Sequence, residues 1–243
     1  MKSESILKNV QESYLSFESY SDVGSVDIVP SFATTLIEFK TFFSRPSKVR
    51  FEWRDWHPYF GKDRPPNENI IWSDGDNSYK CFSGDRTRTQ NLSLAIGGAT
   101  GVSSGAVHKI LKLLMPSCIA LNSAWYDMHE VRILQDESVH GFSCYHLLGT
   151  VKRVNDTEAW ISRDDLLVRR IRATNEINAV DNEKQFARRL AELTELGIRN
   201  ENLPKPTFGV SQYYQEYNYR EIKINSPLPE ELFKFDFPEA ANS

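Results

Sequence analysis

The chain has 243 residues, of which 40% are apolar and 12% aromatic, and its formal net charge is −4. This length allows one large domain or two small ones with a substantial core. The charge argues against a nucleic-acid partner, and no stretch approaches the ~18 apolar residues of a transmembrane helix. The N-terminal residues show no apolar signal core. Either the protein is cytosolic, or an export signal has been removed.

The first predicted element is a helix, because apolar side chains recur at helical spacing at Ile6, Val10, Tyr14 and Phe17. Asp22 and Gly24 are expected to end this region. Strands are then predicted at residues 25–29 and 35–43, because apolar and polar residues alternate there.

A hairpin is predicted from Ile37 to Trp53, with Arg45-Pro46 at its turn. Side chains in a strand point alternately to opposite faces, so one face of this hairpin is apolar and the other is charged. The apolar face consists of Ile37, Phe39, Phe43, Val49, Phe51 and Trp53. This pattern is typical of an antiparallel sheet with one wet face.

Further strands are predicted at residues 69–72 and 79–82, joined by a Ser-Asp-Gly turn. Residues 92–115 form the most apolar part of the chain and predict one hydrophobic helix, or two short ones around residues 97–101. A single helical stripe contains Val107, Ile110, Leu111 and Leu114, and Ser103 or Ser104 can cap the helix.

The remaining predicted strands are residues 131–134, 144–151, 157–162, 167–173 and 210–224. A helix is predicted at 181–197, where Phe186, Leu190 and Leu193 line one face and Gly197 follows. About nine to eleven strands with helices at the start, in the middle and near the end give an α+β class in one domain, residues 1–243.

A candidate nucleophile is Ser103, because residues 101–105 fit the GxSxG pattern of α/β-hydrolases. That motif requires a buried parallel strand that leads into a helix, whereas the predicted strands here alternate. A helix-cap role for Ser103 is therefore favoured. The histidines lack metal-ligand spacing, and no carboxylate pair can be placed at catalytic separation. We predict no catalytic residue, no metal site and no cofactor.

The three cysteines, Cys81, Cys118 and Cys144, form no CxxC motif. They predict either three thiols or one disulfide and one thiol. A bond between Cys118 and Cys144 would connect the region of the apolar helix to the sheet.

An apolar sheet face requires a cover, and residues 92–115 are apolar enough to provide it. Two arrangements satisfy this requirement. Sheet and helices can form a solid core, or the helices can act as a lid over a lipid-sized cavity, since ligand pockets are concave and mostly apolar.

Three segments carry a resemblance to a known family: FKTFFSRPSKVRFEW, IIWSDGDNSY and INSPLPEELFKFDFPEA. They resemble bacterial lipoprotein carriers of the LolA/LolB type, and most closely the relatives called outer-membrane lipoprotein-sorting-like proteins. The resemblance implies a curled antiparallel sheet that forms an incomplete β-barrel, with a helical lid at residues 92–115. It also implies export to the periplasm and a latch role for Arg45, which would hydrogen-bond the lid. The chain departs from the family in its cysteines, its Pro-rich loop at 57–69 and its extra helix at 182–197.

The resulting functional prediction is non-enzymatic binding or transport of a lipid, or of the acyl chains of a lipoprotein, in the cell envelope. A protein partner in the envelope is compatible with it. The predicted ligand-binding side chains are Ile37, Phe39, Phe43, Val49, Phe51, Trp53, Val107, Ile110, Leu111 and Leu114. Two alternatives remain: an envelope sensor or interaction domain of the same fold, and a serine hydrolase that uses Ser103.

Overall fold

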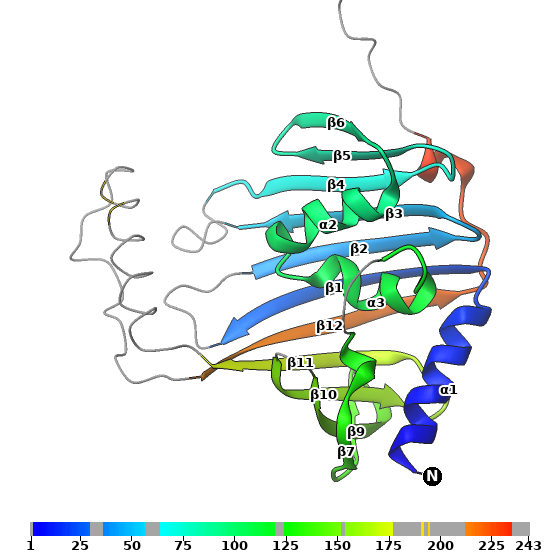
Figure 1. Cartoon of the computed structure of the whole chain (residues 1–243), viewed down its shortest axis with the longest axis vertical. Helices are drawn as coiled ribbons and strands as arrows, with labels where there is room; N and C mark the ends of the chain where they lie inside the picture. Colours follow the sequence, from blue (N-terminus) through cyan, green and yellow to red (C-terminus); the bar gives the residue numbers. More distant parts are fainter. Residues whose placement is uncertain are drawn as a thin grey trace, which may run out of the picture.

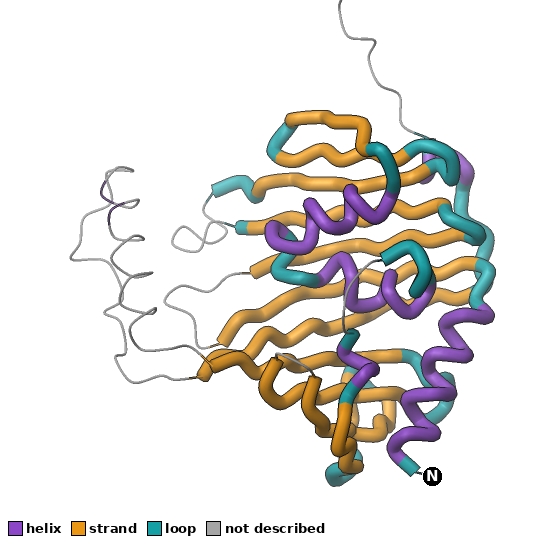
Figure 2. The backbone as a smooth tube through the Cα atoms, in the orientation of Figure 1, coloured by secondary structure: helices purple, strands orange, loops and turns teal. Residues whose placement is uncertain are grey.

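The computed structural model describes residues 2–29, 36–56, 64–119, 124–151, 154–176, 191, 194 and 212–234. Within these residues the protein contains three α-helices and one twelve-stranded antiparallel sheet, which confirms the α+β class (Figure 2). The predicted helix at 181–197 lies outside the described residues, apart from two isolated positions. Most of the Pro-rich loop also lies outside them.

The α-helices are α1 (Ser3–Ser16), α2 (Leu92–Val102) and α3 (Ala106–Leu114), and short 3-10 helices lie at η2 (Trp125–Asp127) and η4 (Glu230–Phe233). The strands are β1 (Ser19–Val29), β2 (Leu36–Ser44), β3 (Lys48–Asp55), β4 (Asn67–Ser73), β5 (Ser78–Phe82), β6 (Asp85–Thr89), β7 (His129–Ile133), β8 (Glu137–Val139), β9 (Phe142–Val151), β10 (Val154–Ser162), β11 (Val168–Glu176) and β12 (Gln212–Ile224).

The strands follow the order β6-β5-β4-β3-β2-β1-β12-β11-β10-β9-β7, and β8 pairs with β9 (Figure 1). The pairing of β1 with β12, from Tyr20–Ile224 to Val29–Tyr214, joins an N-terminal meander to a C-terminal one. Strands β6 and β7 end the sheet at opposite sides, so the described sheet is neither closed nor strongly curled. The expected incomplete barrel was therefore too strong a prediction. The edge strands β6 and β7 are not paired with each other, so the described sheet has two open edges.

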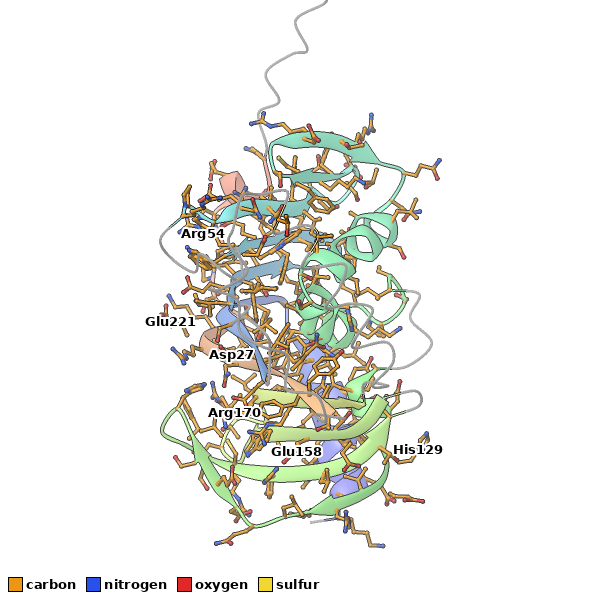
Figure 3. All side chains as sticks on the ribbon, turned by 90° about the vertical axis from the view of Figure 1, so that its left-hand side faces the viewer. Asp27, Arg54, His129, Glu158, Arg170 and Glu221 are labelled. Atoms are coloured by element: carbon orange, nitrogen blue, oxygen red, sulfur yellow. The ribbon has the colours of Figure 1, made fainter. Side chains whose placement is uncertain are left out.

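One face of the sheet, called here the inner face, packs against the helices, and the outer face is polar (Figure 3). The predicted apolar face of the β2–β3 hairpin is the inner face, and its side chains are 0–2% exposed. They lie in the same core as the buried side of α3. The alternation in the sequence thus correctly predicted which side chains of this hairpin point inward.

The start of the chain differs from the prediction. Helix α1 ends at Ser16, and residues 19–29 form a complete strand that includes Asp22 and Gly24. Gly24 does not break this strand. A Cβ atom there would lie 2.2 Å from Cζ of Phe39, so the glycine makes room for an aromatic ring that crosses β1. Strand β6 was also missed, because its exposed residues are all polar and show no alternation.

Candidate ligand-binding site beneath the helices

Helix α3 is fastened to the rest of the protein at both ends. The Tyr217 hydroxyl, from β12, donates a hydrogen bond of 2.7 Å to the Ser104 carbonyl at the turn between α2 and α3. At the other end, the indole of Trp125 donates to the Lys109 carbonyl (3.1 Å) and the Tyr126 hydroxyl donates to the Lys112 carbonyl (3.2 Å). These bonds hold α3 in place over β1 and β12 (Figure 1).

Helix α2 is attached differently, by apolar side chains. It packs on α3 and on strands β4, β5 and β6. Its segment contains no charged residue, and its buried side chains are Leu92, Ala95, Ile96 and Ala99. Its opposite side exposes Leu94 (54%) and Val102 (50%). A helix that is apolar on both sides and attached by apolar contacts can separate from the sheet without breaking buried hydrogen bonds.

Beneath the helices, aromatic rings form a continuous run across the inner face. Ring centroids lie 5.7 Å apart for Tyr219 and Phe39, 5.5 Å for Phe39 and Phe51, 5.6 Å for Phe51 and Trp53, and 5.4 Å for Trp53 and Phe82. We call these five residues the aromatic run. It begins on β12 and ends on β5, where α2 covers it.

A polar cluster lies at the Tyr219 end of the aromatic run. The Asp22 side chain is 2% exposed, and its Oδ2 accepts a 2.8 Å hydrogen bond from the Tyr20 hydroxyl. Thr41, opposite on β2, also hydrogen-bonds this carboxyl. Burial raises the pKa of Asp22 to about 7, although the bonds from Thr41 and Tyr20 oppose the shift. The hydroxyl of Tyr14 belongs to the same cluster and accepts a hydrogen bond from the Val168 amide.

Sequence reasoning did not find this cluster. The signal was present, because Tyr20, Asp22, Gly24 and Val26 share one face of β1 and two of the four are apolar. Two polar atoms of the cluster, Asp22 Oδ1 and the Tyr219 hydroxyl, have no hydrogen-bond partner among the described residues. Trp53 Nε1 in the aromatic run is also buried and has no hydrogen-bond partner among the described residues. Buried polar atoms of this kind are rare and require an explanation.

The predicted ligand-binding side chains are brought together by the structure: all of them belong to one buried core. Arg45, predicted to hydrogen-bond the lid at residues 92–115, lies at the turn between β2 and β3 and bonds the end of α1 instead. Its Nη2 donates to the carbonyls of Leu15 (2.6 Å) and Tyr14 (3.3 Å), and its Nε donates to that of Phe17 (2.8 Å). The last carbonyls of a helix have no partner within the helix, so Arg45 serves as a C-terminal cap of α1.

Ser103 is fully buried at the end of α2, and its Oγ accepts a hydrogen bond of 3.4 Å from the Val107 amide. The residue thus follows a helix, whereas the nucleophile of a GxSxG hydrolase follows a strand. The neighbouring His108 is neutral, because burial and the nearby charge of Lys109 lower its pKa to about 3. The N-cap residue of α3 is Gly105, and not Ser103 or Ser104 as predicted, although Ser103 Oγ still accepts from an amide in the first turn of α3.

The alternative of a disulfide between Cys118 and Cys144 is wrong, since all three cysteines are free. Cys118 packs against the main core, whereas Cys144 belongs to a second small cluster with Val139 and Trp160. His146, paired with Trp160 across β9 and β10, stacks on this tryptophan and hydrogen-bonds Glu158 at 2.7 Å. In the described ranges, no three His, Cys, Asp or Glu side chains gather as metal ligands would.

A groove of about 460 Å³ lies on the outer face, over strands β2 to β5. Its lining alternates in charge and includes Glu38, Lys40, Arg50, Glu52, Arg54 and Glu68. Figure 3 shows Arg54 on the side of the sheet that faces away from the helices. The protein therefore has an apolar site candidate on one face and a charged groove on the other.

Fold and site together define an α+β protein with an open antiparallel sheet and a helical cover over an aromatic inner face. No known protein-family profile matches the sequence, and no curated protein matches it. No helix in the described segments is long and apolar enough to cross a membrane.

Solved structures with similar folds include LprF from Mycobacterium bovis, with a TM-score of 0.45, 8% identity and coverage of 93% of this chain and 94% of that one. A LolA superfamily protein from Nitrosomonas europaea has a TM-score of 0.34 and 13% identity, with coverage of 97% of this chain and 98% of that one. The Pseudomonas aeruginosa MucA/MucB complex has a TM-score of 0.45 and 11% identity, with coverage of 96% of this chain and 60% of that one. A LolA superfamily protein is thus among the structures to which this chain is similar, at a low TM-score. At such identities the similarity concerns the fold alone.

Proposed function

We propose that this protein binds a hydrophobic ligand, a lipid or the acyl chains of a lipoprotein, without catalysing a reaction. The ligand would lie between the inner face and the α2–α3 pair. The observation that carries the proposal is the aromatic run, whose far end is covered by a charge-free helix attached through apolar side chains. The proposal is also supported by the predicted ligand-binding residues, all of which belong to the buried core.

In the proposed mechanism α2 moves and α3 stays. Hydrogen bonds from Tyr217, Trp125 and Tyr126 hold α3, whereas α2 can lift from β4 and β5 about the turn at residues 103–105. Gly105, with φ of +82°, supplies the unusual backbone of that turn. An acyl chain would then replace the contacts that α2 makes with β4 and β5, including the one near Phe82. The closed state buries these contacts, so the protein remains stable without ligand.

The proposal places the protein in the cell envelope, in the periplasm or otherwise exported, as the resemblance implies. Arg45 remains the proposed latch. Its partner is α1, so it would fix the helix that packs beside α3 and thereby the position of the whole cover.

The test uses N-phenyl-1-naphthylamine, an apolar dye that fluoresces in apolar surroundings, with long-chain lipids as competitors. Ala95→Leu adds bulk on the fully buried side of α2. Gly97→Leu introduces the same leucine side chain on the side where a Cβ meets nothing within 4 Å. We expect Ala95→Leu to weaken dye binding several-fold and Gly97→Leu to leave it unchanged.

Thermal unfolding of both variants checks that they are folded. Absence of dye and lipid binding by the wild-type protein would overturn the proposal. Mass spectrometry of lipids that co-purify with the native protein identifies the natural ligand.

A second candidate function, recognition of an envelope protein, is favoured by the charged groove on the outer face. Alternating charges suit a peptide segment of mixed charge. Lys40→Glu reverses one charge of the groove, and Lys8→Glu reverses an exposed charge on α1 as a control. Cross-linking in envelope extracts should yield a partner that Lys40→Glu loses and Lys8→Glu retains. Equal yields for both variants would contradict this function.

A further inference from the structure

The polar cluster at Asp22 contains two unmet hydrogen-bonding groups of complementary kind. Asp22 Oδ1 is a fully buried carboxyl oxygen without a hydrogen-bond partner among the described residues. The hydroxyl of Tyr219 is also buried and also lacks a partner there. The two side chains interact electrostatically, because the Asp22 carboxyl, after burial, contributes to the raised pKa of Tyr219. Leaving such groups unpaired costs each of them its solvation by water. A small group that both accepts and donates a hydrogen bond would satisfy both.

This cluster is also the end of the aromatic run. Tyr219 is both a member of the cluster and the first ring of the run. Its contact with Phe39 exists because β1 has glycine at position 24 between them, where a Cβ would lie 2.2 Å from the Phe39 ring. From Phe39 the rings continue to Phe82 beneath α2. The inner face thus has a polar end and a long apolar path, which is the pattern of a single-chain amphiphile.

We propose that the ligand is an uncharged lipid with a hydroxyl head, such as an alkyl alcohol or an acylglycerol, whose hydroxyl lies between Asp22 and Tyr219. This inference rests on the proposed function. The hydroxyl oxygen accepts a hydrogen bond from the Tyr219 hydroxyl and its hydrogen is donated to Asp22 Oδ1. The alkyl chain follows the aromatic run toward Phe82.

The charges around the cluster disfavour an anionic head group. The groups that act on Asp22 are the neutral Tyr20 and Thr41, and no basic side chain is among them. Burial raises the pKa values of Tyr14, Tyr20 and Tyr219, so these hydroxyls stay protonated. An ionised fatty acid would place a second carboxylate beside Asp22, and Arg169, the buried cation that acts on Tyr14 in this cluster, is already paired with Asp165. A neutral head avoids this repulsion.

Displacement of the dye at pH 8 by three ligands of equal chain length tests the inference: 1-dodecanol, dodecyl methyl ether and dodecanoate. The ether has the shape of an alcohol but cannot donate a hydrogen bond. We expect dodecanol to bind about three- to tenfold more tightly than the ether, the range that one net hydrogen bond provides. Dodecanoate should bind most weakly.

Two variants test the two proposed hydrogen-bond partners of the ligand hydroxyl, Tyr219 and Asp22, one at a time. Tyr219→Phe removes the unpaired hydroxyl, so the preference for dodecanol over the ether should fall toward onefold. Tyr79→Phe, on the outer face where Tyr79 stacks on Trp72, is the control and should keep the preference. Asp22→Asn removes the charge, so the affinity for dodecanoate should rise several-fold relative to that for dodecanol.

The outcomes distinguish this inference from the proposed function. Equal affinities for dodecanol and the ether, or ratios that neither Tyr219→Phe nor Asp22→Asn changes, would overturn the hydroxyl head while the binding function stands. Binding of none of the three ligands or the dye would overturn both.

Discussion

A carboxyl group buried among aromatic rings makes the stability of this protein depend on pH. The pKa of Asp22 is raised from 3.8 to about 7 by burial. Below pH ~4 the carboxyl is protonated in both the folded and the unfolded chain. Between pH ~4 and ~7 only the folded protein keeps the proton, so its stability falls as the pH rises. Above the folded pKa, Asp22 has no further effect.

We therefore expect the unfolding free energy of the wild-type protein to lose at most about 4 kcal/mol through Asp22 between pH 4 and 8. Asp22→Asn should remove this loss and be the more stable protein at pH 8. Urea unfolding of both proteins at pH 4, 6 and 8 measures the difference, in which the titration of other groups cancels. Parallel pH curves for the two proteins would rule out a raised pKa for Asp22.

Arg45 provides a second prediction at the scale of a single residue. Arg45→Leu removes the hydrogen bonds to the carbonyls at the end of α1 and should cost about 2 kcal/mol of stability. Arg45→Lys keeps a positive charge near the helix C-terminus and should recover about 0.5 kcal/mol of this. Urea unfolding measures both values, and amide exchange should show the loss of protection concentrated in α1.

Lys8→Leu is the control for Arg45, because the ion pair of Lys8 with Glu12 is exposed on the same helix. Its effect should stay within about 0.5 kcal/mol. An equally small effect of Arg45→Leu would mean that the guanidinium does not hold α1.

Arg45 and Asp22 also show how much of the site could be predicted from the sequence. The position of Arg45 at the rim of the hairpin followed from the Arg-Pro turn, but its partner helix did not, since turn chemistry is local. Asp22, with Gly24, is expected from the sequence to end the first helix, whereas the structure places it inside β1. Only its place in β1, between Tyr20 and Gly24 on the inner face, shows it to be buried.

At the scale of elements, the glycines of the α2–α3 pair should respond in opposite directions to alanine. Gly97 lies within α2 and faces open space, so Gly97→Ala should stabilise the protein by roughly 0.5–1 kcal/mol. Gly105 has φ of +82°, and a Cβ there would lie 3.2 Å from Cε1 of His108. Gly105→Ala should therefore destabilise by about 1–2 kcal/mol. Thermal unfolding compares the two, and stabilisation by both would contradict the described turn.

The elements themselves were predicted best where one face is apolar and the other is charged. Strands β2 and β3 have this pattern, and the predicted inward side chains are the buried ones. Strand β6 lies at the edge with its residues almost all exposed, so no alternation marks it. Charged residues there, such as Arg86 and Arg88, protect an open edge from pairing with another chain.

At the scale of the whole molecule, the sequence could not predict the order of the strands. Alternation identifies which side chains face inward, whereas a strand's neighbours depend on the path of the chain. The predicted need for a cover over the apolar sheet face agrees with the structure, since Val107 and Phe51 lie in the same core. The pairing of β1 with β12, and with it the position of Tyr219 beside Phe39, required the structure.

The state of the cysteines is a prediction for the whole molecule. Cys118 packs on the main core and Cys144 in the separate cluster around Trp160, so no covalent bond connects the two. A thiol assay of the protein, denatured without reductant, should find three thiols per chain. A value of one thiol per chain would show that two of the cysteines form a disulfide.

The pairing of β1 with β12 has a consequence for how the protein folds. Strands β2 to β5 pair with neighbours in sequence, as do β9 to β11, so each meander can form from local contacts. The two meanders meet in a pair formed by residues 20–29 and 214–224, from opposite ends of the described chain. Closing so long a loop is entropically costly and slow. In pulse-labelled amide exchange during refolding, protection should therefore appear in β2 to β5 and β9 to β11 before it appears in the amides that β1 and β12 share with each other.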